Sequence, residues 1–94
     1  MGDTPKVVLY SNPGCMFCYQ ARMLLTRKGV KIEDIVATQG SEPFAEMLER
    51  TGSRKVPQIF IGNTHVGGFD QLEALDRNGE LDKLLAGQAA GTNT

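Results

Sequence analysis

The chain has 94 residues, of which 40% are hydrophobic and 22% charged, and its formal net charge is −1. This length fits one domain with a single modest core, and the composition excludes disordered and collagen-like chains. The near-neutral charge gives no reason to expect a nucleic-acid partner, and no apolar run is long enough to span a bilayer. We therefore expect a cytoplasmic protein that binds neither nucleic acid nor membrane.

The first half predicts a strand, a helix, a second strand and a second helix. The run Lys6–Tyr10 is apolar and β-branched, as in a buried strand. From Cys15 onward apolar residues recur at helical spacing until Gly29, a typical helix end. Lys31–Val36 has the composition of a second strand, and the short crossover predicts that the two strands are parallel. A second helix is expected from an N-cap at Ser41 to a stop at Gly52.

The second half predicts a hairpin and a closing helix. Pro57 stands at the entrance of the strand "QIFI", and "GNT" is expected to join this strand to "HV". Asp70 and Glu73 have the spacing of a capping box at the start of a helix, with Asp70 as the N-cap. Asn78 and Gly79 should end that helix, and "ELDKLL" should add a last turn or two.

These elements define an α/β fold of the order β-α-β-α-β-β-α. It should hold a mixed four-stranded sheet with helices on both faces. We expect one folded domain over residues 1–85. The small and polar segment 86–94 should be a flexible C-terminal tail.

Both cysteines of the chain, Cys15 and Cys18, stand at the turn between the first strand and the first helix. Residues three apart in a first helical turn lie close enough for a disulfide to form and break. Cys15 should lie just outside the helix, where free N–H groups and the positive end of the dipole favour a thiolate. Residues 1–31 also hold five basic residues against one acidic residue. We expect Cys15 to be the nucleophile and Cys18 the shielded resolving thiol.

Two other interpretations of the cysteine pair are weaker. The spacing also occurs in zinc sites, but beyond the two sulfurs only His65 is a good ligand for a tetrahedral ion. Inert cysteines are the second alternative. A disulfide across two residues would constrain little chain, and a C-x-x-C pair in an intracellular β-α-β unit favours redox chemistry.

Four motifs in register resemble the small bacterial glutaredoxins with two active-site cysteines. They are "CMFC" followed by "ARMLL", then "VPQIFIG", then "HVGGFDQLEALDRNGELDKLL", and the similarity runs from about Val7 to Leu85. The resemblance implies a thioredoxin fold, a redox-active disulfide between Cys15 and Cys18, and a cis bond between Val56 and Pro57. It also implies glutathione-dependent reduction of protein disulfides and glutathione mixed disulfides.

The resemblance further implies where glutathione binds. The implied residues are Phe17, Lys55, Val56, Pro57, Gly68, Phe69 and Asp70. An extended peptide can pair with the Val56 backbone as an added strand. In the family, the residues matching Phe69 and Asp70 bind the γ-glutamyl end through backbone N–H groups and a carboxylate. Lys55 is a candidate for the glycine carboxylate, with Arg50 as a second candidate.

Two positions depart from the family pattern. Asn12 stands where a lysine is frequent, with Arg22 and Lys55 as partial substitutes, and Met16 replaces the usual proline between the cysteines. Some glutaredoxins without that proline leave room for a cluster. A dimer bridging a [2Fe–2S] cluster through Cys15 of each chain and two glutathiones is therefore one alternative function. A thioredoxin-like reductase served by a flavoprotein is another.

The partners implied by the leading function are glutathione and proteins that carry disulfides or glutathionyl groups. We expect a monomer without a resident metal, and a dimer when a cluster is bound.

Overall fold

The computed structural model describes residues 5–87. Its elements are β1 (Val7–Ser11), α1 (Met16–Arg27), β2 (Ile32–Val36), α2 (Glu42–Thr51), β3 (Gln58–Ile61), β4 (Thr64–Gly67), α3 (Phe69–Arg77) and α4 (Glu80–Leu85). The predicted α/β fold class and order of elements are confirmed. Residues 88–94 of the expected tail lie outside the described residues.

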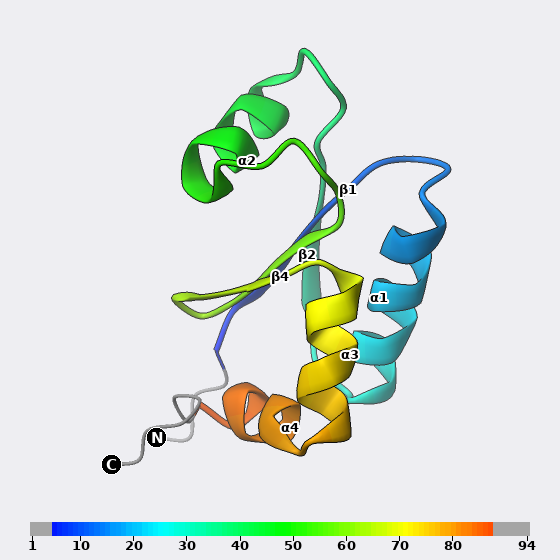
Figure 1. Cartoon of the computed structure of the whole chain (residues 1–94), viewed down its shortest axis with the longest axis vertical. Coiled ribbons are helices and arrows are strands. Elements are labelled where there is room, and N and C mark those ends of the chain that lie inside the picture. Colours follow the sequence, from blue (N-terminus) through cyan, green and yellow to red (C-terminus); the bar gives the residue numbers. More distant parts are fainter. Residues whose placement is uncertain (1–4, 88–94) are drawn as a thin grey trace.

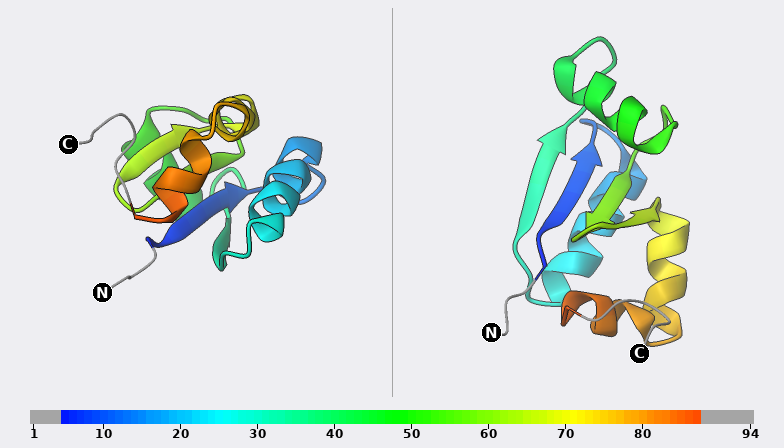
Figure 2. Two further views of the ribbon diagram at one scale, coloured as in Figure 1. Left: turned by 90° about the horizontal axis from the view of Figure 1, so that it is seen from below. Right: turned by 90° about the vertical axis from the view of Figure 1, so that its left-hand side faces the viewer.

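The four strands form one mixed sheet in the order β2-β1-β3-β4. The strand β1 pairs parallel with β2 and antiparallel with β3, and β3 and β4 form the hairpin. This order can be followed in the right-hand view of Figure 2, from teal β2 through blue β1 to the green hairpin. The parallel first pair and the later antiparallel hairpin are both as predicted.

Helices cover both faces of the sheet, which explains why its central strands are continuously apolar. Alternate residues of β1 point to opposite faces, so Val7 and Leu9 join one core cluster while Val8 and Tyr10 join the other. The larger cluster lies under α1, α3 and α4, and the smaller one includes Met47 of α2. In Figure 1, α1 and α3 lie side by side while α2 lies apart from them.

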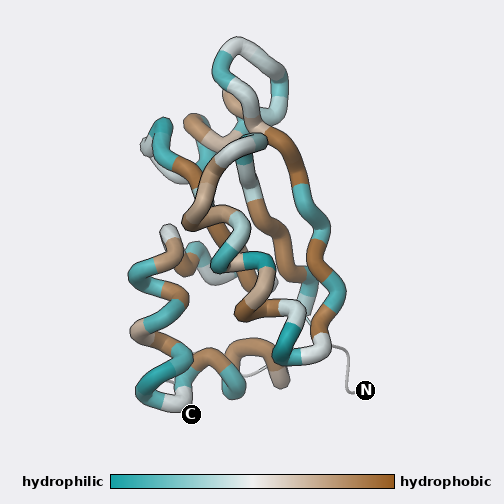
Figure 3. The backbone as a smooth tube through the Cα atoms, turned by 90° about the vertical axis from the view of Figure 1, so that its right-hand side faces the viewer, coloured by the Kyte–Doolittle hydropathy of each residue, from teal (hydrophilic) through white to brown (hydrophobic). Residues whose placement is uncertain are grey.

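The helices are amphipathic, and their exposed faces carry ion pairs. Teal and brown segments alternate along the helices in Figure 3. At the end of α1, Lys28 Nζ lies 2.8 Å from Asp76 and 3.0 Å from Asp82. Hydrogen bonds to these carboxylates raise the pKa of Lys28. These ion pairs therefore link the end of α1 to α3 and α4.

One predicted helix start is wrong. The helix α3 begins at Phe69, its N-cap is Gly68, and the N–H of Gly68 donates to Gln71 Oε1 at 2.9 Å. The capping interaction thus lies two residues earlier than the predicted Asp70 and Glu73 pair. Asp70 stands inside the first helical turn, so its carboxylate is not used as the N-cap.

Within residues 5–87, each helix is too short or too polar to cross a membrane.

Candidate active site

Cys15 and Cys18 lie where the sequence places them, at the turn from β1 into α1. Cys15 is the N-cap of α1, and its Sγ accepts a hydrogen bond from the Cys18 N–H at 3.2 Å. Both cysteines are free thiols, with Cys15 partly exposed and Cys18 only 1% exposed. The Cys15 sulfur therefore lies at the N-terminus of α1, where the first backbone N–H groups have no partner within the helix. The geometry thus gives one accessible sulfur for attack and one shielded sulfur behind it.

The environment of Cys18 favours its neutral thiol. Burial, followed by hydrogen bonding with Cys15, raises the pKa of Cys18 from an ordinary 9.0 to about 12. The Asn12 backbone and the Arg22 charge oppose this shift only in part. Near neutral pH, Cys18 therefore keeps its proton until another group removes it.

A groove of about 390 Å³, called here the proline groove, opens beside Cys15. Its lining residues are Phe17, Lys55, Val56, Pro57, Gln58, Gly68, Phe69, Asp70 and Gln71. The Val56–Pro57 bond is cis, and the Val56 carbonyl oxygen lies 4.0 Å from Cys15 Sγ. All seven residues that the resemblance implies for glutathione thus come together in one groove, although they come from three separate parts of the chain.

The wall of the proline groove opposite the cis bond is built by the start of α3. Gly67 has a φ of +111°, which favours glycine, and a Cβ on Gly68 would lie 3.5 Å from the Pro57 carbonyl oxygen. The Phe69 ring stacks on the Phe17 ring of α1 with centroids 6.0 Å apart. This packing leaves the first-turn N–H groups of α3 and the exposed Asp70 carboxylate beside the groove.

The two candidate cations for a carboxylate have different surroundings. Lys55 is exposed and lines the groove, and its Nζ forms no ion pair with any side chain of residues 5–87. Arg50 is absent from the lining. It donates to Tyr10 Oη at 2.9 Å, and its guanidinium lies 3.9 Å from the centroid of the Phe60 ring. Lys55 is therefore the better candidate.

Sequence reasoning missed Gln58, a buried amide that lines the proline groove. Its Nε2 donates to the Lys55 carbonyl at 3.0 Å, and its Oε1 lies 2.7 Å from His65 Nε2. The His65 ring in turn stacks on Phe60 at 4.8 Å. Gln58 thus fixes the backbone that carries Lys55 and Val56. A polar residue directly after Pro57, in an otherwise apolar strand, was the available signal.

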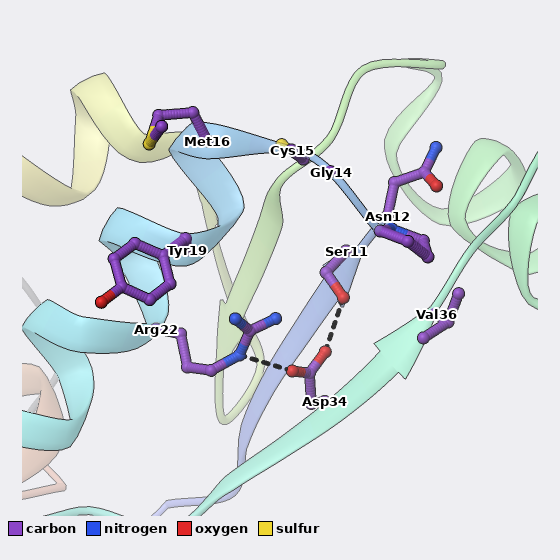
Figure 4. Close-up of a pocket in the computed structure, with 10 residues that line it drawn as sticks. Ser11, Asn12, Gly14, Cys15, Met16, Tyr19, Arg22, Asp34 and Val36 are labelled. Carbon is purple, nitrogen blue, oxygen red and sulfur yellow. Dashed lines mark hydrogen bonds and ion pairs between the residues drawn. The ribbon is translucent and has the colours of Figure 1, made fainter.

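A second hollow, of about 450 Å³, lies beside Cys15 and is called here the arginine hollow. Its lining residues are Ser11, Asn12, Pro13, Gly14, Cys15, Met16, Tyr19, Arg22, Asp34 and Val36. Figure 4 shows Asp34 of β2 between two partners: it accepts from Ser11 Oγ at 2.6 Å and from Arg22 Nε at 2.6 Å. The positions noted as departures from the family, Asn12 and Met16, both line this hollow.

In the described part of the chain, residues 5–87, no three His, Cys, Asp or Glu side chains are grouped so that they could hold a metal ion.

Comparisons with known proteins agree with this geometry. The glutaredoxin family model matches residues 7–66. A glutaredoxin of Pseudomonas aeruginosa is 49% identical over 82 residues, covering 87% of this chain and 98% of that protein. The solution structure of a glutaredoxin from Brucella melitensis is 45% identical with a TM-score of 0.80, covering 99% of this chain and 98% of its own. The crystal structure of a buckwheat glutaredoxin–glutathione complex is 31% identical with a TM-score of 0.79, covering 92% of this chain and 81% of its own.

The fold and the cysteine pair define a thiol–disulfide oxidoreductase with a thioredoxin fold. The chain belongs to the glutaredoxin family.

Proposed function

We propose that this chain uses glutathione to reduce glutathione mixed disulfides and the disulfides of proteins. The observation that carries the proposal is the proline groove, where Lys55, the Val56 backbone and Asp70 gather beside the accessible Cys15. The similar buckwheat glutaredoxin forms a complex with glutathione.

The proline groove offers a complementary group for each part of glutathione. This tripeptide carries an amine and a carboxylate on its γ-glutamyl residue and a second carboxylate on its glycine. Asp70 would take the amine, while the N–H groups at the start of α3 would take the first carboxylate. Lys55 would bind the glycine carboxylate, and the backbone of Val56 would pair with the extended peptide. The cysteine sulfur of glutathione would then lie next to Cys15.

Mixed disulfides need only Cys15. Its thiolate attacks the glutathione sulfur, the disulfide bond breaks, and the substrate thiolate leaves and takes a proton from water. A second glutathione thiolate then attacks the disulfide formed on Cys15. Glutathione disulfide is released, and the Cys15 thiolate is regenerated.

Protein disulfides also need Cys18. After Cys15 has attacked, Cys18 loses its proton and displaces the substrate thiolate, which leaves a disulfide between Cys15 and Cys18. Two glutathiones then reduce this disulfide and leave as glutathione disulfide. Because burial raises the pKa of Cys18, we expect this resolving step to become faster as the pH rises above neutral.

Reduction of a glutathionylated peptide by the wild type, Cys15→Ser and Cys18→Ser tests the proposal. Cys18→Ser should remain active, while Cys15→Ser should lose activity. Normal activity of Cys15→Ser would show that the assignment is wrong. Faster wild-type turnover with a flavoprotein disulfide reductase than with glutathione would instead favour a thioredoxin-like reductase.

A second candidate function is the binding of a [2Fe–2S] cluster between two chains. Burial of Cys18 leaves one accessible cysteine sulfur on each chain. Two Cys15 thiolates and two glutathione thiolates would supply the four sulfurs that such a cluster takes. Anaerobic reconstitution with iron, sulfide and glutathione tests this candidate, with Cys15→Ser as the control. Absence of visible absorption and of a dimer in the wild type would remove it.

We infer that the protein acts as a monomer in the cytoplasm, where glutathione is kept reduced. Its partners would be glutathione and proteins that carry accessible disulfides or glutathionyl groups.

A further inference from the structure

The arginine hollow adjoins Cys15, but the proposed reaction of glutathione does not use it. Its floor is the chain of contacts from Ser11 through Asp34 to Arg22, which joins β1, β2 and α1. Its rim includes three apolar side chains that are unusually exposed: Met16 at 65%, Tyr19 at 54% and Val36 at 49%. The hollow therefore combines a polar floor with an apolar rim.

The two terminal nitrogens of Arg22 are available as hydrogen-bond donors within this hollow. Only its Nε is hydrogen-bonded to an acceptor in residues 5–87, so both terminal nitrogens retain their N–H groups. Figure 4 shows these nitrogens pointing into the hollow below Cys15. Asp34 differs, because each of its oxygens already accepts a bond, one from Ser11 and one from Arg22. The hollow is thus better suited to an acceptor than to a donor, and a carboxylate matches the planar fork of a guanidinium.

The identity of the ligand follows from how a mixed disulfide must lie. When its glutathione part fills the proline groove, the polypeptide part must cover other surface beside Cys15. The arginine hollow supplies such surface, with an apolar rim for the polypeptide. We propose that the hollow binds the polypeptide flank of a glutathionylated substrate, and that Arg22 binds an Asp or Glu carboxylate in that flank. This inference rests on the proposed function.

Asp34 acts in this proposal as a positioning residue. Its bond to Nε fixes the plane of the Arg22 guanidinium while leaving the two terminal nitrogens available. The bond from Ser11 fixes Asp34 in turn. Asp34→Asn should therefore weaken the recognition of an acidic flank without removing the cation.

The test uses two glutathionylated peptides that differ only by Glu or Gln next to the cysteine. We expect the wild type to favour the Glu peptide about two- to fivefold in kcat/KM, mainly through KM, as for a partly exposed charged pair. Arg22→Gln should abolish this ratio, and Arg22→Lys and Asp34→Asn should reduce it. Arg27→Gln, the same charge change farther along α1 and outside the hollow, is the control and should keep the ratio.

Several results would overturn the inference. Equal kcat/KM of the wild type for the two peptides would do so without any variant, and so would a ratio that survives in Arg22→Gln. A raised KM for free glutathione in Arg22→Gln, with the ratio intact, would assign the hollow to the reductant. If the wild type reduced neither peptide, the proposed function itself would fail, and the inference would fall with it.

Discussion

Asp70 is proposed above to bind the amine of glutathione, and its position in α3 allows this role to be tested separately from folding. It lies in the first turn of α3, exposed beside the proline groove, and it is not the N-cap. Since the N-cap is Gly68, a change at Asp70 should leave the helix start in place. Its effect should therefore appear in ligand binding.

We expect Asp70→Asn to lower kcat/KM for a glutathionylated peptide about tenfold, mainly by raising KM. Because Asp70 is exposed, the loss of its charged hydrogen bond should cost the lower end of the usual range, about 1.5 kcal/mol, and each 1.4 kcal/mol corresponds to about a factor of ten. Steady-state kinetics measures the effect. Glu46→Gln, the same charge change on the exposed side of α2, is the matched control. Equal kinetics of the two variants would contradict the role of Asp70.

Gln58 should act through the backbone that it holds. In Gln58→Leu the Lys55 carbonyl loses its donor, so we expect a higher KM for the mixed disulfide and a smaller change in kcat. Gln58→Glu keeps the shape but removes the donor, and should behave similarly. His65→Ala removes the other partner of Gln58 and should have a weaker effect. A large fall in kcat with KM unchanged would show that Gln58 acts elsewhere.

At this scale the sequence predicted seven of the nine residues that line the proline groove, but not the contacts between distant side chains. Phe17, Pro57 and Asp70 belong to recognisable motifs, so their convergence could be anticipated. The bond between Arg22 and Asp34 depends on how α1 lies over β2, and that of Gln58 with His65 depends on the hairpin register. Strand register and helix orientation depend on several elements at once, so a single sequence motif does not predict them.

Like β4 and α4, the helix α2 contributes no lining residue to the proline groove or to the arginine hollow. Its start is fixed by Ser41, whose Oγ accepts from the Phe44 N–H at 3.3 Å and donates to the Thr38 carbonyl at 2.6 Å. The effect of this cap on stability can thus be measured separately from activity.

Ser41→Ala should reduce the free energy of unfolding by about 1 kcal/mol, the usual cost of losing an N-cap. Urea denaturation measures this change. Ser41→Asp, which can also cap a helix, should retain most of the stability, and both variants should keep wild-type kcat/KM. A fall in kcat/KM with unchanged stability would mean that α2 takes part in binding.

Element boundaries were predictable where one residue type dominates the choice. Ser41 and Gly52 mark the ends of α2, and Cys15 marks the start of α1, as expected. The start of α3 was misplaced because Asp70 and Glu73 match a capping box better by residue type than Gly68 and Gln71 do. Gly67, directly before Gly68, has a φ of +111° that favours glycine, so the chain turns there between β4 and α3, and a capping-box pattern does not register this turn.

In the whole molecule, the buried Cys18 thiol couples redox chemistry to stability. Its pKa is about 12 in the folded chain against an ordinary 9.0, so the folded state holds the proton more tightly. The resulting stabilisation is fully present below about pH 9 and is lost as the pH rises towards about 12.

The reduced wild type should therefore lose about 1.4 kcal/mol more stability than Cys18→Ala between about pH 8 and pH 10. Urea denaturation of both proteins under a reductant at each pH measures this difference. Subtracting the variant removes the contribution of the other groups that titrate in the same range. Parallel losses in the two proteins would show that Cys18 is not a neutral buried thiol.

The fold also explains why the proline groove and the arginine hollow both lie beside the sulfur of Cys15. The end of β1 carries Cys15 to a point where the β2 edge lies on one side and the cis-proline turn with the start of α3 lies on the other. Glutathione and a polypeptide could thus be held at the same time around one nucleophile.

The intact mass of Cys18→Ser after incubation with glutathione disulfide tests the central claim most directly. We expect the mass to rise by one glutathionyl group, located on Cys15 by peptide mapping, and to return to its starting value when glutathione is added. Cys15→Ser should gain no mass under the same conditions. A Cys18→Ser protein that stays unmodified, or a Cys15→Ser protein that becomes modified to the same extent, would contradict the assignment of Cys15 as the nucleophile that carries glutathione.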